Sequence, residues 1–152
     1  MPSVQKILVP VDLSPSSNKA LAEARAFAEA FGASIDLLYV WSVPTLIAPE
    51  AVIAGVGINE QPLFDWIRHN ATTELAKFQA NAEHDGINVH DSICEPGDPA
   101  TSIVEHAKSG HYDLVVMGTH GRTGLSHVIL GSVTEKVVRR APCPVLTVRT
   151  SD

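Results

Sequence analysis

The segment DLVVMGTHGRTGLSHVILGSVTEKVVRR, Asp113–Arg140, decides the fold because it joins a buried-strand pattern, a glycine-rich loop and a helix start. Four apolar residues after Asp113 end abruptly at Gly118, as expected for a strand covered on both faces. Ser132 and Glu135 have the spacing of a capping box, and Gly131 is the alternative capping residue. A helix is therefore predicted to begin at this point.

The loop in this segment has the spacing glycine, two residues, glycine, nine residues, glycine and serine. Glycines let the backbone take positive φ and approach a ligand closely, and free N–H groups at a helix N-terminus carry partial positive charge. A phosphate is the natural ligand, with the hydroxyls of Ser132 and Thr134 as candidate donors. The alternative is a surface loop whose glycines serve only as turns.

Two better-known phosphate motifs are absent from the sequence. There is no G-x-x-x-x-G-K-[ST], which disfavours a P-loop NTPase. No G-x-G-x-x-G follows the first predicted strand, and the second strand ends at Trp41 without the acid that would bind a dinucleotide ribose. A nicotinamide-dependent dehydrogenase is therefore disfavoured as well.

Three pieces of the chain resemble the universal stress protein family, specifically its ATP-binding branch. They are KILVPVD at residues 6–12, the Gly118-x2-Gly121-x9-Gly131-Ser132 motif with its MGTHGRTG loop, and APCPVLTV at residues 141–148. The resemblance spans nearly the whole chain and leaves mainly Ser42–Pro62 unsupported. It implies a Rossmann-like fold, similar to the adenine nucleotide alpha hydrolases, with five parallel strands in the order 3-2-1-4-5.

Strand and helix patterns alternate along the rest of the chain. Strands are predicted at residues 6–11, 34–41, about 88–94, 114–117 and 145–148, with helices at 15–31, about 63–85, 99–109 and from 132. The first helix has apolar residues at helical spacing, namely Leu21, Ala24, Ala28 and Phe31, and the second has Ile67, Ala71, Leu75, Phe78 and Ala82 on one face. Such alternation requires one doubly wound parallel sheet with helices on both faces.

Ligands of such sheets bind beyond the carboxyl ends of the strands, where the winding direction reverses. The implied strand order places the reversal between the first and fourth strands, so Asp12 and Gly118 are expected to face each other across one crevice. Asp12 can accept hydrogen bonds from ribose hydroxyls or an adenine amino group and repels phosphate, so it marks the nucleoside end. The alternative role for Asp12 is a helix cap beside Ser14.

The resemblance also implies which residues surround the adenine. Val40 would offer backbone groups and an apolar wall, and Pro10, Val11 and Met117 would line the same pocket. For Val11, Val40 and Met117 the alternative is plain core packing.

Along the ribose and phosphates, the resemblance implies contacts from Gly118, His120, Gly121, Gly131, Ser132, Val133 and Thr134. Arg122 is the only fixed positive charge inside the loop, so it is a candidate phosphate contact or a solvated side chain. His120 and His127 are further candidates, since histidine titrates near neutral pH. A divalent ion, Mg²⁺ or Mn²⁺, is expected to arrive with ATP, and no protein metal ligands are assigned.

Catalysis is not predicted. Asp12, His120 and Ser132 could be written as a triad, but no G-x-S-x-G elbow surrounds Ser132. An ATPase needs a carboxylate that holds Mg²⁺, and Glu135, the only acid near the loop, is assigned to the capping box. We expect an ATP-binding regulatory stress protein with slow or no hydrolysis. The alternatives are a slow ATPase or phosphotransferase, and a dimeric interaction module that binds no nucleotide.

Composition excludes several other classes. The 152 residues, 45% hydrophobic and 18% charged, fit one globular domain over residues 1–152. The longest apolar stretch, Thr45–Ile58, is interrupted and too short to span a bilayer, and the opening lacks a leader pattern, so a cytoplasmic location is expected. Cys94 and Cys143 form no C-x-x-C arrangement. The net charge of −6 disfavours nucleic-acid binding.

The final predicted strand, Val145–Val148, is apolar and lies at a sheet edge, where an open strand invites aggregation. Antiparallel pairing with a second copy would give a two-fold dimer, which the family resemblance also implies. The alternative is an edge shielded by Pro142, Pro144 and Arg149. Ser42–Pro62 is too apolar for a solvated loop, so it is expected to cover the pocket, extend the dimer or receive a partner.

Overall fold

The computed structural model describes residues 3–42, 63–120 and 130–149. Its strands are β1 (Lys6–Val11), β2 (Ser34–Trp41), β3 (Asp91–Pro96), β4 (Leu114–Gly118) and β5 (Val145–Val148). Its helices are α1 (Pro15–Phe31), α2 (Leu63–His84), α3 (Pro99–Ser109) and α4 (Ser132–Arg140). The predicted alternation of strands and helices is confirmed.

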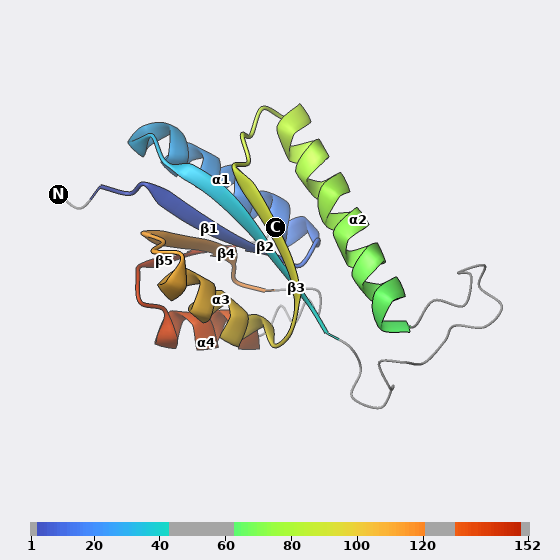
Figure 1. The fold of residues 1–152 in the computed structure, drawn as a ribbon. Coiled ribbons are helices and arrows are strands. Elements are labelled where there is room, and N and C mark those ends of the chain that lie inside the picture. Colours follow the sequence, from blue (N-terminus) through green and yellow to red (C-terminus); the bar gives the residue numbers. More distant parts are fainter. Residues whose placement is uncertain (1–2, 43–62, 121–129, 150–152) are drawn as a thin grey trace.

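All strand pairs are parallel, and the sheet order is β3-β2-β1-β4-β5. Figure 1 shows α1 and α2 on one face of the sheet and α3 and α4 on the other. The predicted doubly wound sheet is therefore confirmed. No helix in the described ranges is long and apolar enough to cross a membrane.

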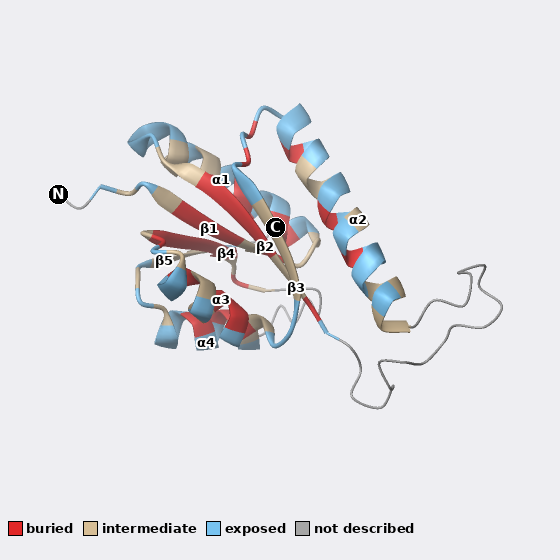
Figure 2. Cartoon of the chain, in the orientation of Figure 1, coloured by how far each residue is buried: buried red, intermediate tan, exposed pale blue. Residues whose placement is uncertain are grey.

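Alternate residues of the central strands enter two separate cores. Ile7 and Val9 pack with α1 and α2 residues such as Leu21 and Leu75, whereas Leu8 packs with α3 and α4 residues such as Ile103. Each of these side chains is at most 3% exposed, and Figure 2 shows the buried strands between the two helix layers. Burial on both faces explains why the strands read as continuous apolar runs.

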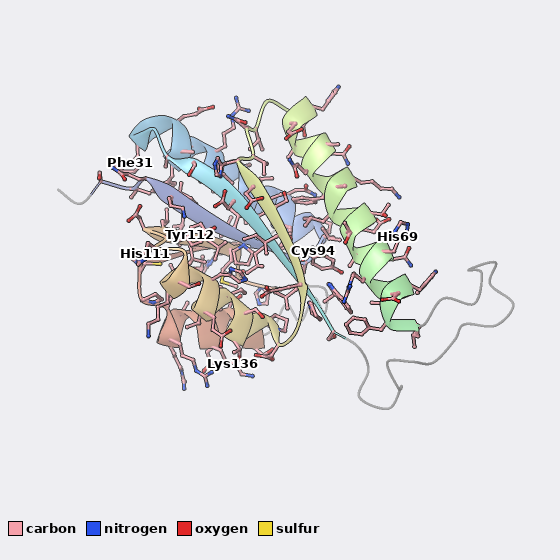
Figure 3. The ribbon with its side chains drawn as sticks, viewed as in Figure 1. Phe31, His69, Cys94, His111, Tyr112 and Lys136 are labelled. Carbon is pink, nitrogen blue, oxygen red and sulfur yellow. The ribbon has the colours of Figure 1, made fainter. Side chains whose placement is uncertain are left out.

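The helix ends follow local chemistry. Gly32 ends α1 in the left-handed conformation at φ 69°, and its N–H donates to Ala28 O. At α3, Asp98 accepts a hydrogen bond from the Thr101 backbone N–H, and this bond lowers the pKa of the Asp98 carboxyl. Phe31, the last residue of the apolar repeat in α1, is 52% exposed at the final position of the helix (Figure 3).

Strand β3 begins at Asp91, three residues later than predicted, and continues to Pro96. The chain approaches the sheet through Ile87 and Val89, which are buried in the core on the α1 and α2 face. Just before Asp91, a backbone hydrogen bond from His90 N to Ile35 O joins this segment to β2. Apolar burial in this lead-in segment produced the strand-like pattern.

A buried polar cluster joins β2 to the segment before β4. Asp36 is 4% exposed, and its carboxylate accepts a hydrogen bond from the Tyr112 hydroxyl at 2.7 Å. His90 Nδ1 lies 2.9 Å from the other carboxylate oxygen. Burial raises the pKa of the Tyr112 hydroxyl, and the hydrogen bond to Asp36 raises it further. This cluster lies near the amino ends of the strands, away from the predicted crevice.

Candidate functional site

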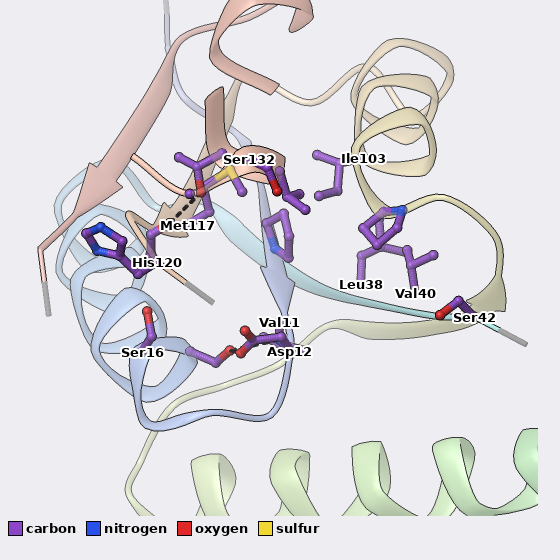
Figure 4. Close-up of a pocket in the computed structure, with 17 residues that line it drawn as sticks. Val11, Asp12, Ser16, Leu38, Val40, Ser42, Ile103, Met117, His120 and Ser132 are labelled. Atoms are coloured by element: carbon purple, nitrogen blue, oxygen red, sulfur yellow. Dashed lines mark hydrogen bonds between the residues drawn. The ribbon is translucent and has the colours of Figure 1, made fainter. Parts of the chain in front are cut away.

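A cavity of about 490 Å³ opens beyond the carboxyl ends of β1, β2 and β4 (Figure 4). It is lined by Pro10, Val11, Asp12, Ser16, Ser17, Leu38, Val40, Ser42, Pro99, Ile103, Met117, Gly118, His120, Gly131, Ser132, Val133 and Thr134. Asp12 and Gly118 both line it, in agreement with the switch-point argument.

Eleven of the thirteen predicted site residues line this one cavity. The other two, Gly121 and Arg122, lie outside the described residues, as do His127 and residues 43–62. The structure thus gathers short segments from β1, β2, β4 and the start of α4 that are separated by up to about 120 residues of sequence. Which ligand they contact remains a prediction.

The residues at the apolar end of the cavity line the cavity and also pack in the hydrophobic core. Leu38, Ile103 and Met117 are at most 5% exposed and belong to the core on the α3 and α4 face, and they also line the cavity. Leu38, Pro99 and Ile103 line the cavity although they were not predicted as site residues. The junction of β3 and α3 could have indicated Pro99 and Ile103 as site residues, because α3 also starts at the carboxyl edge of the sheet.

Asp12 lies in the turn that precedes α1, and it also lines the cavity. Its Oδ1 accepts hydrogen bonds from Ser14 N at 3.0 Å and from the hydroxyls of Ser14 and Ser17. Its own N–H donates to Ser17 Oγ at 2.9 Å. The N-cap of α1 is Ser14, so Asp12 orders the turn before the helix, and these hydrogen bonds hold its carboxylate in place beside the cavity.

Gly118 is a glycine for packing reasons. Among the described residues, the glycines with positive φ are Gly32, Gly86 and Gly97, so Gly118 and Gly131 do not adopt the left-handed conformation that glycine permits. A Cβ added at Gly118 would collide with Ser16 Oγ. Glycine at this position lets the first turn of α1 lie directly against the end of β4.

We predict that Gly118→Ala lowers the free energy of unfolding by about 1 kcal/mol, because Ser16 must leave its present rotamer. Ser16→Ala removes the colliding oxygen, so the loss should largely disappear in the double variant. Urea denaturation of the wild type, the two single variants and the double variant measures the coupling free energy between the two substitutions. An equal loss with and without the Ser16 hydroxyl would contradict this account of Gly118.

Helix α4 begins at Ser132, and Gly131 is its N-cap. The predicted capping box is wrong, because Ser132 is already helical and the Glu135 carboxylate instead pairs with Arg139 at 2.7 Å. The Thr134 hydroxyl donates to Gly118 O at 2.8 Å, so in this structure it joins α4 to β4. The first three backbone N–H groups of α4 have no partner within the helix, and their residues, Ser132, Val133 and Thr134, line the cavity.

The charge around the cavity is uneven. Among the described lining residues, Asp12 is the one carboxylate, and none is a lysine or arginine. His120 is half-buried, with Nδ1 3.0 Å from Thr119 Oγ1. Attraction for an anion therefore comes mainly from the amino end of α4, opposite the end that holds Asp12.

These features fit an adenine nucleotide. The volume lies within the usual range for small-molecule sites, roughly 300–1,000 Å³. An apolar end suits a base, a fixed carboxylate suits a ribose, and a helix N-terminus suits phosphates. One buried polar atom in the lining, Ser16 Oγ, has no hydrogen-bond partner among the described residues. No three His, Cys, Asp or Glu side chains within the described ranges lie close enough to hold a metal ion.

Fold and cavity together define an open, doubly wound α/β protein with a cavity at its switch point. The chain belongs to the universal stress protein family, whose family model matches residues 3–149.

Relatives and solved structures agree with this assignment. Universal stress protein MJ0531 of Methanocaldococcus jannaschii is 37% identical over 145 residues, covering 95% of this chain and 82% of the relative. YxiE of Bacillus subtilis is 33% identical over 148 residues, covering 95% and 98%. The solved structure of MJ0577 superposes with a TM-score of 0.79 at 30% identity, covering 99% of both chains. A universal stress protein solved in complex with cAMP has a TM-score of 0.66 at 26% identity, covering 99% of this chain and 100% of that one.

Proposed function

We propose that this chain is a cytoplasmic, ATP-binding regulatory protein of the stress response, and that nucleotide occupancy alters its contacts with other proteins. The observation that carries the proposal is that Asp12, Val40 and the first turn of α4 line the same cavity. A relative with the same fold was solved with cAMP, which is also an adenine nucleotide. Mg²⁺ or Mn²⁺ is proposed to enter with the nucleotide.

Two free thiols support the proposed cytoplasmic location, because the cytoplasm is a reducing compartment. Cys94 and Cys143 are both unpaired, as is usual for cytoplasmic proteins. Burial raises the pKa of each thiol, which keeps both protonated and poorly reactive near neutral pH.

Thermal denaturation with and without ATP and Mg²⁺ tests nucleotide binding. Saturation at about 100 times Kd should add about 2.7 kcal/mol to the free energy of unfolding, whereas Mg²⁺ alone should add little. Absence of any shift at millimolar ATP would favour the interaction module that binds no nucleotide.

Hydrolysis is proposed to be slow or absent. Glu135, the acid closest in sequence to the start of α4, is paired with Arg139 on the exposed side of that helix, and the Thr134 hydroxyl is bound to Gly118 O. Phosphate release by the wild type should therefore be no faster than release by Ser132→Ala. Faster release by the wild type would favour the ATPase or phosphotransferase.

We also propose a two-fold dimer through β5, which lies at one edge of the sheet. All four of its residues are partly exposed. Pro144 O accepts a hydrogen bond from Val115 N in β4, and Val148 O accepts one from Thr119 N just after β4, each at 3.0 Å. The backbone groups of Val145 and Thr147, which alternate with these positions, therefore point away from β4. Those outward groups are available to a second copy.

Thr147→Pro is predicted to dissociate this dimer, because it removes an outward N–H donor and leaves the pairing with β4 intact. Thr147→Val keeps the N–H and serves as the matched control. Sedimentation velocity should show one chain for Thr147→Pro and two for the control. A wild type that sediments as one chain would contradict the dimer.

A further inference from the structure

Three serines surround the start of α1, and they differ in their hydrogen bonds. The hydroxyls of Ser14 and Ser17 both donate to Asp12 Oδ1. Ser16 Oγ has no hydrogen-bond partner among the described residues, although Ser16 is only 9% exposed. Buried hydroxyls are nearly always partnered because leaving one unpaired costs free energy. The exception at Ser16 therefore needs an explanation.

The position of Ser16 suggests an explanation for its unpartnered hydroxyl. Ser16 lines the cavity, and its Oγ occupies the space that a side chain at residue 118 would fill. In Figure 4 it lies with Asp12 on the α1 side of the cavity, with Ser132 on the other side. Ser16 thus stands at the end of the cavity where the sugar of a nucleotide is expected.

We propose that Ser16 is a ligand-binding residue whose hydroxyl donates to a ribose hydroxyl of the bound nucleotide, an inference that rests on the proposed function. A ribose hydroxyl accepts one hydrogen bond and donates another, so it bridges the Ser16 hydroxyl and the Asp12 carboxylate. A phosphate oxygen only accepts and is repelled by Asp12, which excludes it from this position. The proposal requires a change in the χ1 angle of Ser16 that turns its hydroxyl away from Gly118 and into the cavity.

The proposal predicts opposite effects on stability and on binding. Ser16→Ala removes an unpartnered hydroxyl, so the Tm of the nucleotide-free protein should stay the same or rise. The same variant should bind ATP about tenfold more weakly, which corresponds to about 1.4 kcal/mol. Ser17→Ala is the matched control, because it removes a hydrogen bond to Asp12 and should lower the Tm by about 3 °C.

Calorimetric titration of wild type and Ser16→Ala with ATP, 2′-deoxy-ATP and 3′-deoxy-ATP tests the assignment. The tenfold penalty on ATP should shrink to about twofold or less with the deoxy analogue that lacks the bridging hydroxyl. An equal penalty with all three nucleotides, or no penalty with ATP, would overturn the role of Ser16 and leave nucleotide binding standing. Absence of ATP binding by the wild type would instead remove the proposed function, and this inference with it.

Discussion

Ser132→Asp should weaken ATP binding by about 100-fold while leaving the nucleotide-free protein as stable as the wild type or slightly more stable. The new carboxylate lies at the first position of α4, where it complements the partial positive charge of the helix N-terminus. The same charge repels bound phosphate by up to about 4 kcal/mol at 4 Å in a partly solvated site. Stability and affinity therefore change independently.

Ser132→Asn is the control for this variant, because it has nearly the same shape without the charge. Calorimetry gives the affinity, and urea denaturation gives the stability. The repulsion should also weaken as salt is added, since it is electrostatic. If Ser132→Asp binds ATP as the wild type does, the phosphates lie elsewhere and the assignment of α4 is wrong.

Asp36→Ala should lower the free energy of unfolding by about 3 kcal/mol, the largest stability effect that we predict. Asp36 is 4% exposed, and its loss leaves the buried Tyr112 hydroxyl without its acceptor. The His90 ring loses its partner at the same time. Because Asp36, His90 and Tyr112 are not among the residues that line the cavity, ATP affinity should be little changed in the folded fraction.

Asp91→Ala is the matched control, since Asp91 pairs with Asp36 in register but is exposed, so its loss should change stability little. Tyr112→Phe in the Asp36→Ala background should recover part of the loss by removing the orphaned hydroxyl. Urea denaturation measures all four proteins. Equal losses for Asp36→Ala and Asp91→Ala would show that the cluster does not contribute to stability.

The pH dependence of stability gives an independent check on Tyr112. Its pKa is raised in the folded state, so the folded protein keeps the phenol proton that the unfolded chain releases near pH 10. The stability from this residue is complete below about pH 10 and is lost as pH rises further. Tyr112→Phe should therefore lose less stability than the wild type between about pH 9 and 11.

The fold could be predicted because its signals are local. Cap residues such as Asp98, a terminating glycine at Gly32 and apolar runs in strands covered on both faces are each read within a few residues. The start of β3 was missed because Ile87 and Val89 are buried without being part of the strand. Burial alone does not distinguish a strand from the segment that leads into it.

The site was predictable where a strand end carries a distinctive residue, as at Asp12 and Gly118. Ser16, Pro99 and Ile103 come from the starts of two helices, and only the assembled sheet brings those starts to one cavity. Asp36 was missed for the same reason, because its partners His90 and Tyr112 are 54 and 76 residues away. No local pattern indicates a pair so distant in sequence.

Amide ¹H–¹⁵N spectra recorded during an ATP titration test the central claim most directly. Bound phosphates should shift the resonances of Ser132, Val133 and Thr134, and the base should shift Val40, while Lys77 on the exposed face of α2 stays unchanged. Saturating shifts at those positions, with one nucleotide per chain, are the predicted result. Unchanged amides at the start of α4 in the presence of millimolar ATP would contradict the account.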